Sequence, residues 1–178
     1  MQSNSDLTLP HIVTLKDGTE ALIRKAGSED FQMLYRMFNS FSVETMFRRF
    51  LMSHTGLEAR DVQEMLRLGD SNVTSLIAVV HEDGKEKAVG EARYVADSAG
   101  RIAEAGIVVA DDSQNRGLGT ALFSDLVAEG RRQGLKKMIA YFDVDNKAVV
   151  RVGQKAGFKL APTGPSTDYS MIRAEIEL

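Results

Sequence analysis

The sequence contains no cysteine among its 178 residues. This absence excludes disulfide bonds, thiolate metal sites and a cysteine nucleophile. The three histidines, His11, His54 and His81, lack the spacing of metal ligands and are expected at the surface or in turns. We therefore predict no metal site and no covalent catalysis through sulfur.

Basic charge and long apolar runs are also scarce. Lys and Arg number 22 against 25 Asp and Glu, which gives a net charge of −3 and a pI of about 5.7. This balance offers no basic surface for nucleic acid or for an anionic membrane. The sequence has no run of about 18 apolar residues, and MQSNSDLTLP, residues 1–10, lacks the pattern of a signal peptide. We expect a soluble, cytoplasmic protein whose ligand is a small molecule or another protein.

The length and composition fit one domain. With 43% hydrophobic residues, a chain of 178 residues can bury one core and is short for two. Residues 1–9 are polar and aperiodic, so they are expected to form a flexible leader. Residues 10–178 are then expected to fold as a single domain.

Hydrophobic periodicity predicts a mixture of strands and helices. Asp17–Gly18 and Asp83–Gly84 each lie between two alternating apolar runs, which predicts a tight hairpin at both places. Helical spacing follows Ser28 and Ser42, which can serve as caps, and recurs in LEARDVQEMLRLG, where Gly69 suits the helix end.

The last part of the chain alternates between the two kinds of element. The expected elements are a strand in residues 100–110, a helix over 117–133, a strand over 136–144, a helix over 147–156, and strands near 158 and over 168–178. This order predicts an α/β fold, in which a mixed sheet carries helices on both faces.

The most informative motif follows the strand of residues 100–110. In DDSQNRGLGTALF, residues 111–123, Gly117 and Gly119 lie where a strand passes into an amphipathic helix. A helix N-terminus presents unsatisfied N–H groups and partial positive charge, and glycine lets an anion approach the backbone. The loop therefore suits a diphosphate, although an isolated G-x-G is more often a plain connection.

Two familiar phosphate loops fit less well. A Walker loop is excluded because the Lys and hydroxyl pair is missing. A dinucleotide fingerprint would need a small residue where Leu122 stands, yet Asp143 ends the next strand near the position of a ribose-binding acid. Dinucleotide binding therefore stays open as an alternative.

A third pattern fits without omissions. Gln114-x-x-Gly117-x-Gly119 resembles the Q/R-x-x-G-x-G/A loop of the GNAT N-acetyltransferase superfamily, and DNKAVVRVGQKAGFKL resembles its later N-x-x-A-to-GF segment. The resemblance covers residues 19–175, loosely in the first third. FSVETMFRRFL and AEAGIVVADDSQNRGLG are most similar to the acetyltransferase domain of Pat-type protein lysine acetyltransferases.

The resemblance implies a mostly antiparallel sheet that is flanked by helices and splayed at the cofactor site. It also implies acetyl-CoA as cosubstrate and a protein lysine as acceptor, with an acyl-CoA synthetase as candidate partner. The acceptor groove would come largely from residues 28–70.

The resemblance further implies which residues hold acetyl-CoA. Backbone amides from Asn115 to Thr120 would bind the diphosphate, and Arg116 would add a charge-assisted bond. A splayed strand edge would pair with the pantetheine arm. Asn146 would bond the same arm or simply cap the last helix. The cofactor residues expected are Ile107, Val108, Val109, Gln114, Asn115, Arg116, Gly117, Leu118, Gly119, Thr120 and Asn146.

Acetyl transfer needs a base, because a lysine amine is protonated near pH 7. Glu104 matches the family's catalytic glutamate, and its apolar sequence neighbours are expected to desolvate it and raise its pKa. Glu91 is the reserve candidate. A backbone N–H near Val108 or Val109 would stabilise the oxyanion. Gly153 stands where many relatives place a tyrosine acid, so no acid is assigned.

Two further functions remain open on the sequence alone. The protein could acetylate a small-molecule amine instead of a protein. It could also be a non-catalytic acyl-CoA sensor, in which the glycine loop binds the cofactor and Glu104 is incidental.

Overall fold

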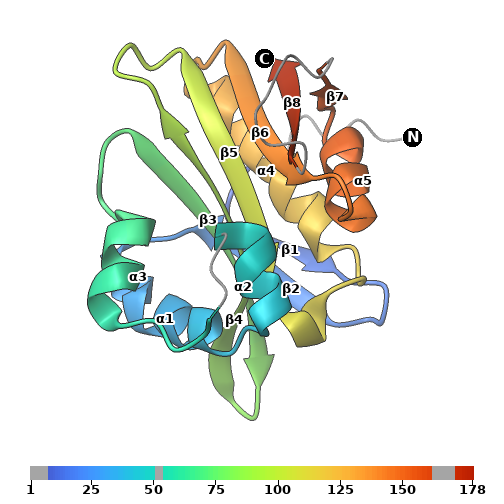
Figure 1. The fold of residues 1–178 in the computed structure, drawn as a ribbon. Coiled ribbons are helices and arrows are strands. Elements are labelled where there is room, and N and C mark those ends of the chain that lie inside the picture. Colours follow the sequence, from blue (N-terminus) through green and yellow to red (C-terminus); the bar gives the residue numbers. More distant parts are fainter. Residues whose placement is uncertain (1–7, 51–53, 162–170) are drawn as a thin grey trace.

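A mixed eight-stranded sheet with helices on both faces forms the framework of the computed structural model, which describes residues 8–50, 54–161 and 171–178 (Figure 1). The strands are β1 (His11–Thr14), β2 (Glu20–Lys25), β3 (Val73–Glu82), β4 (Lys85–Ala96), β5 (Ile102–Val109), β6 (Lys137–Asp143), β7 (Lys159–Leu160) and β8 (Met171–Glu177). The helices are α1 (Phe31–Asn39), α2 (Val43–Phe50), α3 (Ala59–Leu66), α4 (Leu118–Arg132) and α5 (Lys147–Lys155), with short 3-10 helices η2 (Ser28–Asp30) and η3 (Asp111–Ser113). The predicted fold class is confirmed.

The strand order is β1-β2-β3-β4-β5-β6-β8-β7, and only β5 and β6 pair in parallel. The first five strands pair antiparallel, and β3, β4 and β5 form the antiparallel meander that the alternating pattern of residues 72–110 predicts. The tight turns between neighbouring strands use Gly18, at φ 88°, and the pair Asp83 and Gly84, at φ 51° and 74°. Positive φ at both central residues is what a type I′ hairpin requires, which explains the Asp-Gly sequence.

The parallel pairing of β5 with β6 stops before either strand ends. Its register runs from Ile102 opposite Lys137 to Ala105 opposite Ala140. Beyond that pair β5 continues to Val109 and stays bonded to β4, while β6 continues beside β8. The two strands therefore part, and beyond Ala105 one backbone edge of β5 has no neighbouring strand among the described residues.

Each face of the sheet has its own hydrophobic core. Helices α1, α2 and α3 cover one face, and α4 and α5 cover the other (Figure 1). On the α4 face, Phe123 stacks on Phe158 at 4.9 Å between ring centroids, and Phe142 meets both rings edge-on. Burial of each such ring stabilises the fold by about 1.5–3 kcal/mol.

Three expectations about helix ends have mixed outcomes. Ser42 caps α2 as predicted, since its Oγ accepts the N–H of Thr45 at 3.2 Å. Ser28 is not a helix cap: it opens η2, and α1 begins only at Phe31. Likewise α3 ends at Leu66, with Arg67 as its C-cap in the left-handed region at φ 47°, before the chain reaches Gly69.

Two residues near the start of the chain, Leu9 and His11, are more buried than the sequence predicts. The side chain of His11 is only 12% exposed and lies 3.4 Å from Asp125 of α4, so the prediction of a surface histidine is wrong. Burial raises the pKa of Asp125. Leu9 packs against the core, and therefore belongs to the folded part, while residues 1–7 of the predicted leader lie outside the described residues. No helix in the described ranges is long and apolar enough to cross a membrane.

Candidate active site

A groove of about 890 Å³ opens where β5 and β6 part. Its walls come from the end of β5, the loop before α4, the first turn of α4, the end of β6, α5 and α2. It contains most of the predicted site residues, which the chain contributes from positions 104 to 146. The parting of the strands therefore creates the space that the sequence predicts for a cofactor.

The register of β5 decides which of its backbone groups face this groove. Ala110 donates its N–H to the Val89 carbonyl at 2.9 Å, and antiparallel pairs alternate between bonded and non-bonded positions. The backbone groups of Val108 therefore point to β4, whereas those of Ile107 and Val109 point to the parted edge. The β5 edge expected from the sequence is present, but the prediction that Val108 donates its N–H to the groove is wrong, because this N–H points to β4.

The glycine loop presents a row of unused amides at the start of α4. The five N–H groups from Asn115 to Gly119 donate no hydrogen bond to any residue that the structure describes. Positive φ at Asn115 (63°) and Gly117 (95°) curls the backbone there. Such a row, reinforced by the helix dipole, has the geometry that suits an anion. The amide of Thr120 is not part of it, because it already bonds the Gly117 carbonyl at 3.1 Å.

The second glycine lies on the floor of the groove. A Cβ placed at Gly119 would lie 3.6 Å from Val152, 3.7 Å from Val109 and 3.8 Å from Ile107. These are ordinary contact distances, so a methyl group fits and a longer side chain would fill the groove. Leu118 is 1% exposed in the core and can offer a ligand only its backbone.

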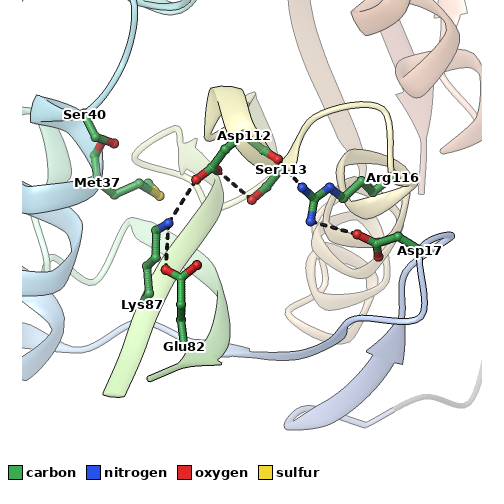
Figure 2. A network of polar contacts seen from close by, with 8 residues as sticks. All are labelled: Asp17, Met37, Ser40, Glu82, Lys87, Asp112, Ser113 and Arg116. Atoms are coloured by element: carbon green, nitrogen blue, oxygen red, sulfur yellow. Dashed lines mark hydrogen bonds and ion pairs between the residues drawn. The ribbon is translucent and has the colours of Figure 1, made fainter. Parts of the chain in front are cut away.

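The side chain of Arg116 turns away from the groove. Figure 2 shows it reaching Asp17, with Nη1 at 2.8 Å from the carboxylate, and the Asp112 carbonyl, at 2.5 Å from Nη2. Lys87 holds the Asp112 carboxylate at 2.9 Å and Glu82 at 3.1 Å, and its hydrogen bond lowers the pKa of Asp112. Arg116 therefore stabilises the outer side of the loop. Its guanidinium does not point to where the sequence predicts a bond to a diphosphate.

A second set of bonds joins the loop to α2. The carboxylate of Asp111 accepts hydrogen bonds from the Oγ of Ser42 at 2.8 Å and from the Oγ1 of Thr45 at 2.7 Å. Burial raises the pKa of Asp111, but the hydrogen bonds from the backbone N–H of Ser42, at 2.9 Å, and from the two hydroxyls outweigh it and leave the pKa below its ordinary value. Gln114 donates its amide to Thr45 at 3.3 Å and to the Val109 carbonyl at 3.1 Å. The motif glutamine thus fixes the end of β5.

Asn146 and Gly153 both belong to the α5 side of the groove. The Oδ1 of Asn146 accepts the N–H of Val149 at 3.1 Å, which makes it the cap of α5. Asn146 also lines the groove, so its amide nitrogen can still reach a ligand. A Cβ at Gly153 would lie 2.5 Å from the ring of Phe142, so the packing leaves no room for a tyrosine there.

The two candidate bases have different environments. Glu104 lines the groove and is exposed, so the predicted desolvation is wrong. The reason is strand alternation: Ala103 and Ala105 point to the opposite face and cannot cover it. Glu91 is fully buried, with one oxygen at 3.2 Å from the Oγ of Ser75, and does not line the groove. Glu91 therefore has no access to an acceptor.

Several groove residues lie outside the glycine-loop motif. Lys16, on the β1–β2 turn, donates its N–H to the Arg116 carbonyl at 3.0 Å, and its side chain passes over Gly117. Arg49 of α2 and Tyr141 of β6 line the other end. No local spacing connects these positions to the motif, because the fold alone brings them together.

Comparisons with known proteins agree with this geometry. An acetyltransferase of Pseudomonas aeruginosa is 29% identical over 138 residues, which are 78% of this chain and 74% of that protein. The solved GNAT domain of PAT from S. lividans has a similar fold, with a TM-score of 0.81 at 24% identity over 95% of this chain and 97% of that one.

A spermidine N-acetyltransferase from Vibrio cholerae, solved in complex with CoA and spermine, also shares the fold. Its TM-score is 0.67 at 16% identity, over 88% of this chain and 95% of that one. The family model of the acetyltransferase (GNAT) domain matches residues 21–159. This match covers most of the chain, and it favours an acetyltransferase over the dinucleotide-binding alternative. The chain belongs to the GNAT acetyltransferase family.

Proposed function

We propose that this enzyme transfers the acetyl group of acetyl-CoA directly to the side-chain amine of a protein lysine, with Glu104 as the base. One observation carries the proposal. The five unused amides from Asn115 to Gly119 and the carboxylate of Glu104 border one groove, at the point where β5 and β6 part. An anchor for a diphosphate and an acceptor for a proton thus share one continuous space.

The residues present suit acetyl-CoA. The amide row at the start of α4 matches a diphosphate, and the backbone groups of Ile107 and Val109 match the amides of a pantetheine arm. Acetyl-CoA, when bound, supplies a thioester as the electrophile. Asn146, on the opposite wall, can donate its free amide to the same arm.

Glu104 supplies the proton acceptor. A lysine amine, with an ordinary pKa of about 10.4, is almost entirely protonated near pH 7 and cannot attack a carbonyl. Glu104 is exposed within the groove and can take this proton directly or through one water molecule. The freed nitrogen lone pair then forms the new C–N bond.

The backbone of β5 supplies the second catalytic element. The N–H groups of Ile107 and Val109 point into the groove, so one of them can donate to the acetyl oxygen as negative charge grows on it while the other bonds the pantetheine arm. The C–S bond then breaks, CoA leaves as a thiolate, and the nitrogen releases its second proton to water. Water rather than a side chain protonates that thiolate, since Gly153 leaves no room for a tyrosine.

The choice of a protein lysine rests on the likeness to the Pat-type domain. FSVETMFRRFL and the loop of residues 103–119 carry that resemblance, and the fold similarity to the GNAT domain of S. lividans PAT supports it. An acyl-CoA synthetase is the candidate partner. A small amine is the alternative acceptor, since the spermidine enzyme shares the fold.

The test is acetyl transfer from labelled acetyl-CoA. The protein is incubated with an acyl-CoA synthetase, lysine peptides and a panel of small amines including spermidine. We expect label on lysine, with the synthetase preferred. Transfer to small amines alone would overturn the protein substrate, and binding of acetyl-CoA without transfer to any acceptor would instead favour the sensor alternative.

A further inference from the structure

Arg49 occupies the point where the two strands part. Its guanidinium lies against Gly106, which follows directly after the last β5–β6 pair. A Cβ at Gly106 would lie 2.7 Å from Nη2 and 2.8 Å from Cζ, so the close approach depends on glycine. Arg49 also lines the groove, on the face of the sheet that α2 covers. This cation therefore lies beside the place proposed for the reaction.

The guanidinium has no hydrogen-bond or ion-pair partner among residues 8–50, 54–161 and 171–178. Its Nε is completely buried and unbonded, and its one notable contact is the Phe50 ring, whose centroid lies 4.9 Å from Cζ. The pKa of Arg49 is lowered to about 10, mainly by burial. The charge of Arg93 also lowers it, and the charges of Glu91 and Glu104 offset part of the effect. Arg49 is thus still charged at neutral pH.

A buried N–H group without a partner is costly, and the Nε of Arg49 is such a group, while the rest of the half-buried side chain lines the groove. Its sequence neighbour shows the usual alternative: Arg48 is more exposed and pairs with Glu44 at 2.6 Å. Glu91 acts on Arg49 through its charge but makes no hydrogen bond or close ion pair with it, since its hydrogen bond goes to Ser75 and its ion pair to Arg93. The free N–H groups of Arg49 therefore suit an oxygen that a ligand brings into the groove.

The spacing from Glu104 indicates which ligand this is. Glu104 and Gly106 lie two residues apart on one strand, so they share a face and their Cα atoms are separated by roughly 6.6 Å. An amine at Glu104 and a negative group at Arg49 would then belong to one acceptor molecule. A carboxylate matches the planar fork of a guanidinium best.

We propose that Arg49 binds a carboxylate carried by the acceptor, and so selects amines that have an acidic group a few bonds from the nitrogen. This inference rests on the proposed acetyl transfer. The carboxylate has two sources: the acceptor's own acid group, as in an amino acid, or an acidic residue beside a lysine in a protein. Polyamines, which carry only positive charge, are disfavoured at this position.

The test compares acceptors that differ only in the carboxylate. One pair is 6-aminohexanoate and hexylamine, and a second is a blocked Asp-Lys dipeptide and its Asn-Lys counterpart. We expect the acidic member of at least one pair to have a kcat/KM roughly 10- to 100-fold higher, mainly through a lower KM. Preference within the first pair alone indicates a small acid, and preference within the second indicates a protein site.

The variants Arg49→Gln and Arg49→Lys assign the preference to this side chain. Arg49→Gln should abolish it by raising the KM of the acidic acceptor only, and Arg49→Lys should retain part of it. Equal kcat/KM values within both pairs, or a preference that survives Arg49→Gln, would overturn the inference.

A second variant tests the same role without replacing Arg49, in case Arg49→Gln folds poorly. Gly106→Ala keeps the charge of Arg49 but pushes its guanidinium aside, so it should reduce the same preference. Acetyl-CoA affinity and the melting temperature of each variant show whether the protein is intact. Absence of any amine acetylation by the wild type would refute the proposed function itself, whereas acetylation that ignores the carboxylate refutes only the role of Arg49.

Discussion

The two ends of the groove differ in the chemical groups that line them: backbone groups at one end and side chains at the other. At the end proposed for the cofactor, the backbone offers the binding groups: amides from Asn115 to Gly119 and the parted edge of β5. At the acceptor end, the side chains of Glu104, Arg49 and Tyr141 line the space. The cofactor end is therefore defined by chain conformation, and the acceptor end by the identity of a few side chains.

This difference predicts that the two ends tolerate different substitutions. A diphosphate is held by N–H groups that every residue type has, so only glycines that permit the conformation are required. An acceptor is recognised by charge and shape, which α2 and β6 supply from distant parts of the chain. Substitutions at the two ends should therefore affect different kinetic constants.

The largest effect is expected at the acceptor end. Glu104→Gln removes the proton acceptor and should lower kcat by about 10²–10⁴-fold, while leaving acetyl-CoA affinity unchanged. Steady-state kinetics and calorimetry of the variant measure the two quantities. Glu44→Gln, a change in another groove carboxylate, is the matched control and should alter kcat little. A Glu104→Gln enzyme with wild-type turnover would exclude this residue as the base.

At the cofactor end, Gly119 offers a matched pair of variants. Gly119→Val places a side chain between Val152 and Val109 on the groove floor and should weaken acetyl-CoA binding by about 1–3 kcal/mol. Gly119→Ala adds only a methyl group at ordinary contact distance and should bind nearly as the wild type does. Calorimetric titration compares the two affinities. Equal affinity in both variants would mean that the cofactor does not lie over this residue.

A smaller effect is expected at Asn146, where two roles can be separated. Asn146→Ala removes the cap of α5, which costs about 1 kcal/mol and lowers the melting temperature by about 2–4 °C. Asn146→Ser keeps a capping oxygen but removes the amide donor. If Asn146 also holds the pantetheine arm, Asn146→Ser should melt like the wild type yet bind acetyl-CoA more weakly. Unchanged affinity would leave Asn146 as a cap alone.

The smallest effect concerns Asp111, which joins the two ends through Ser42 and Thr45. Its pKa is lowered in the folded state, so its charge stabilises the protein above the ordinary carboxyl pKa. This contribution is lost as the pH falls through the lowered value. Asp111→Asn should therefore melt below the wild type at pH 7, and the difference should shrink below about pH 4. A difference that stays constant down to pH 2 would contradict this role.

Sequence patterns predicted the backbone features well. The Asp-Gly hairpins, the antiparallel meander and the strand–loop–helix at Gly117 follow from local rules that each segment obeys by itself. The splay between β5 and β6 came only from the family resemblance, since the register that ends at Ala105 depends on two strands far apart in the chain.

Side-chain directions were less predictable. Arg116 turns to Asp17, a residue almost a hundred positions earlier, and no spacing within the motif shows this. Glu104 is exposed because its apolar sequence neighbours lie on the other face of the sheet. The burial of His11 against Asp125 likewise depends on how β1 meets α4. Each of these cases is decided by tertiary packing.

The central claim is that the amides at the start of α4 hold a diphosphate. Protein labelled with ¹⁵N-glycine gives at most 15 glycine amide signals, among which are those of Gly117 and Gly119. Titration with acetyl-CoA should shift these two signals strongly, and pantetheine, which lacks the diphosphate, should leave that of Gly117 in place. Saturation with acetyl-CoA without movement of either signal would contradict the account.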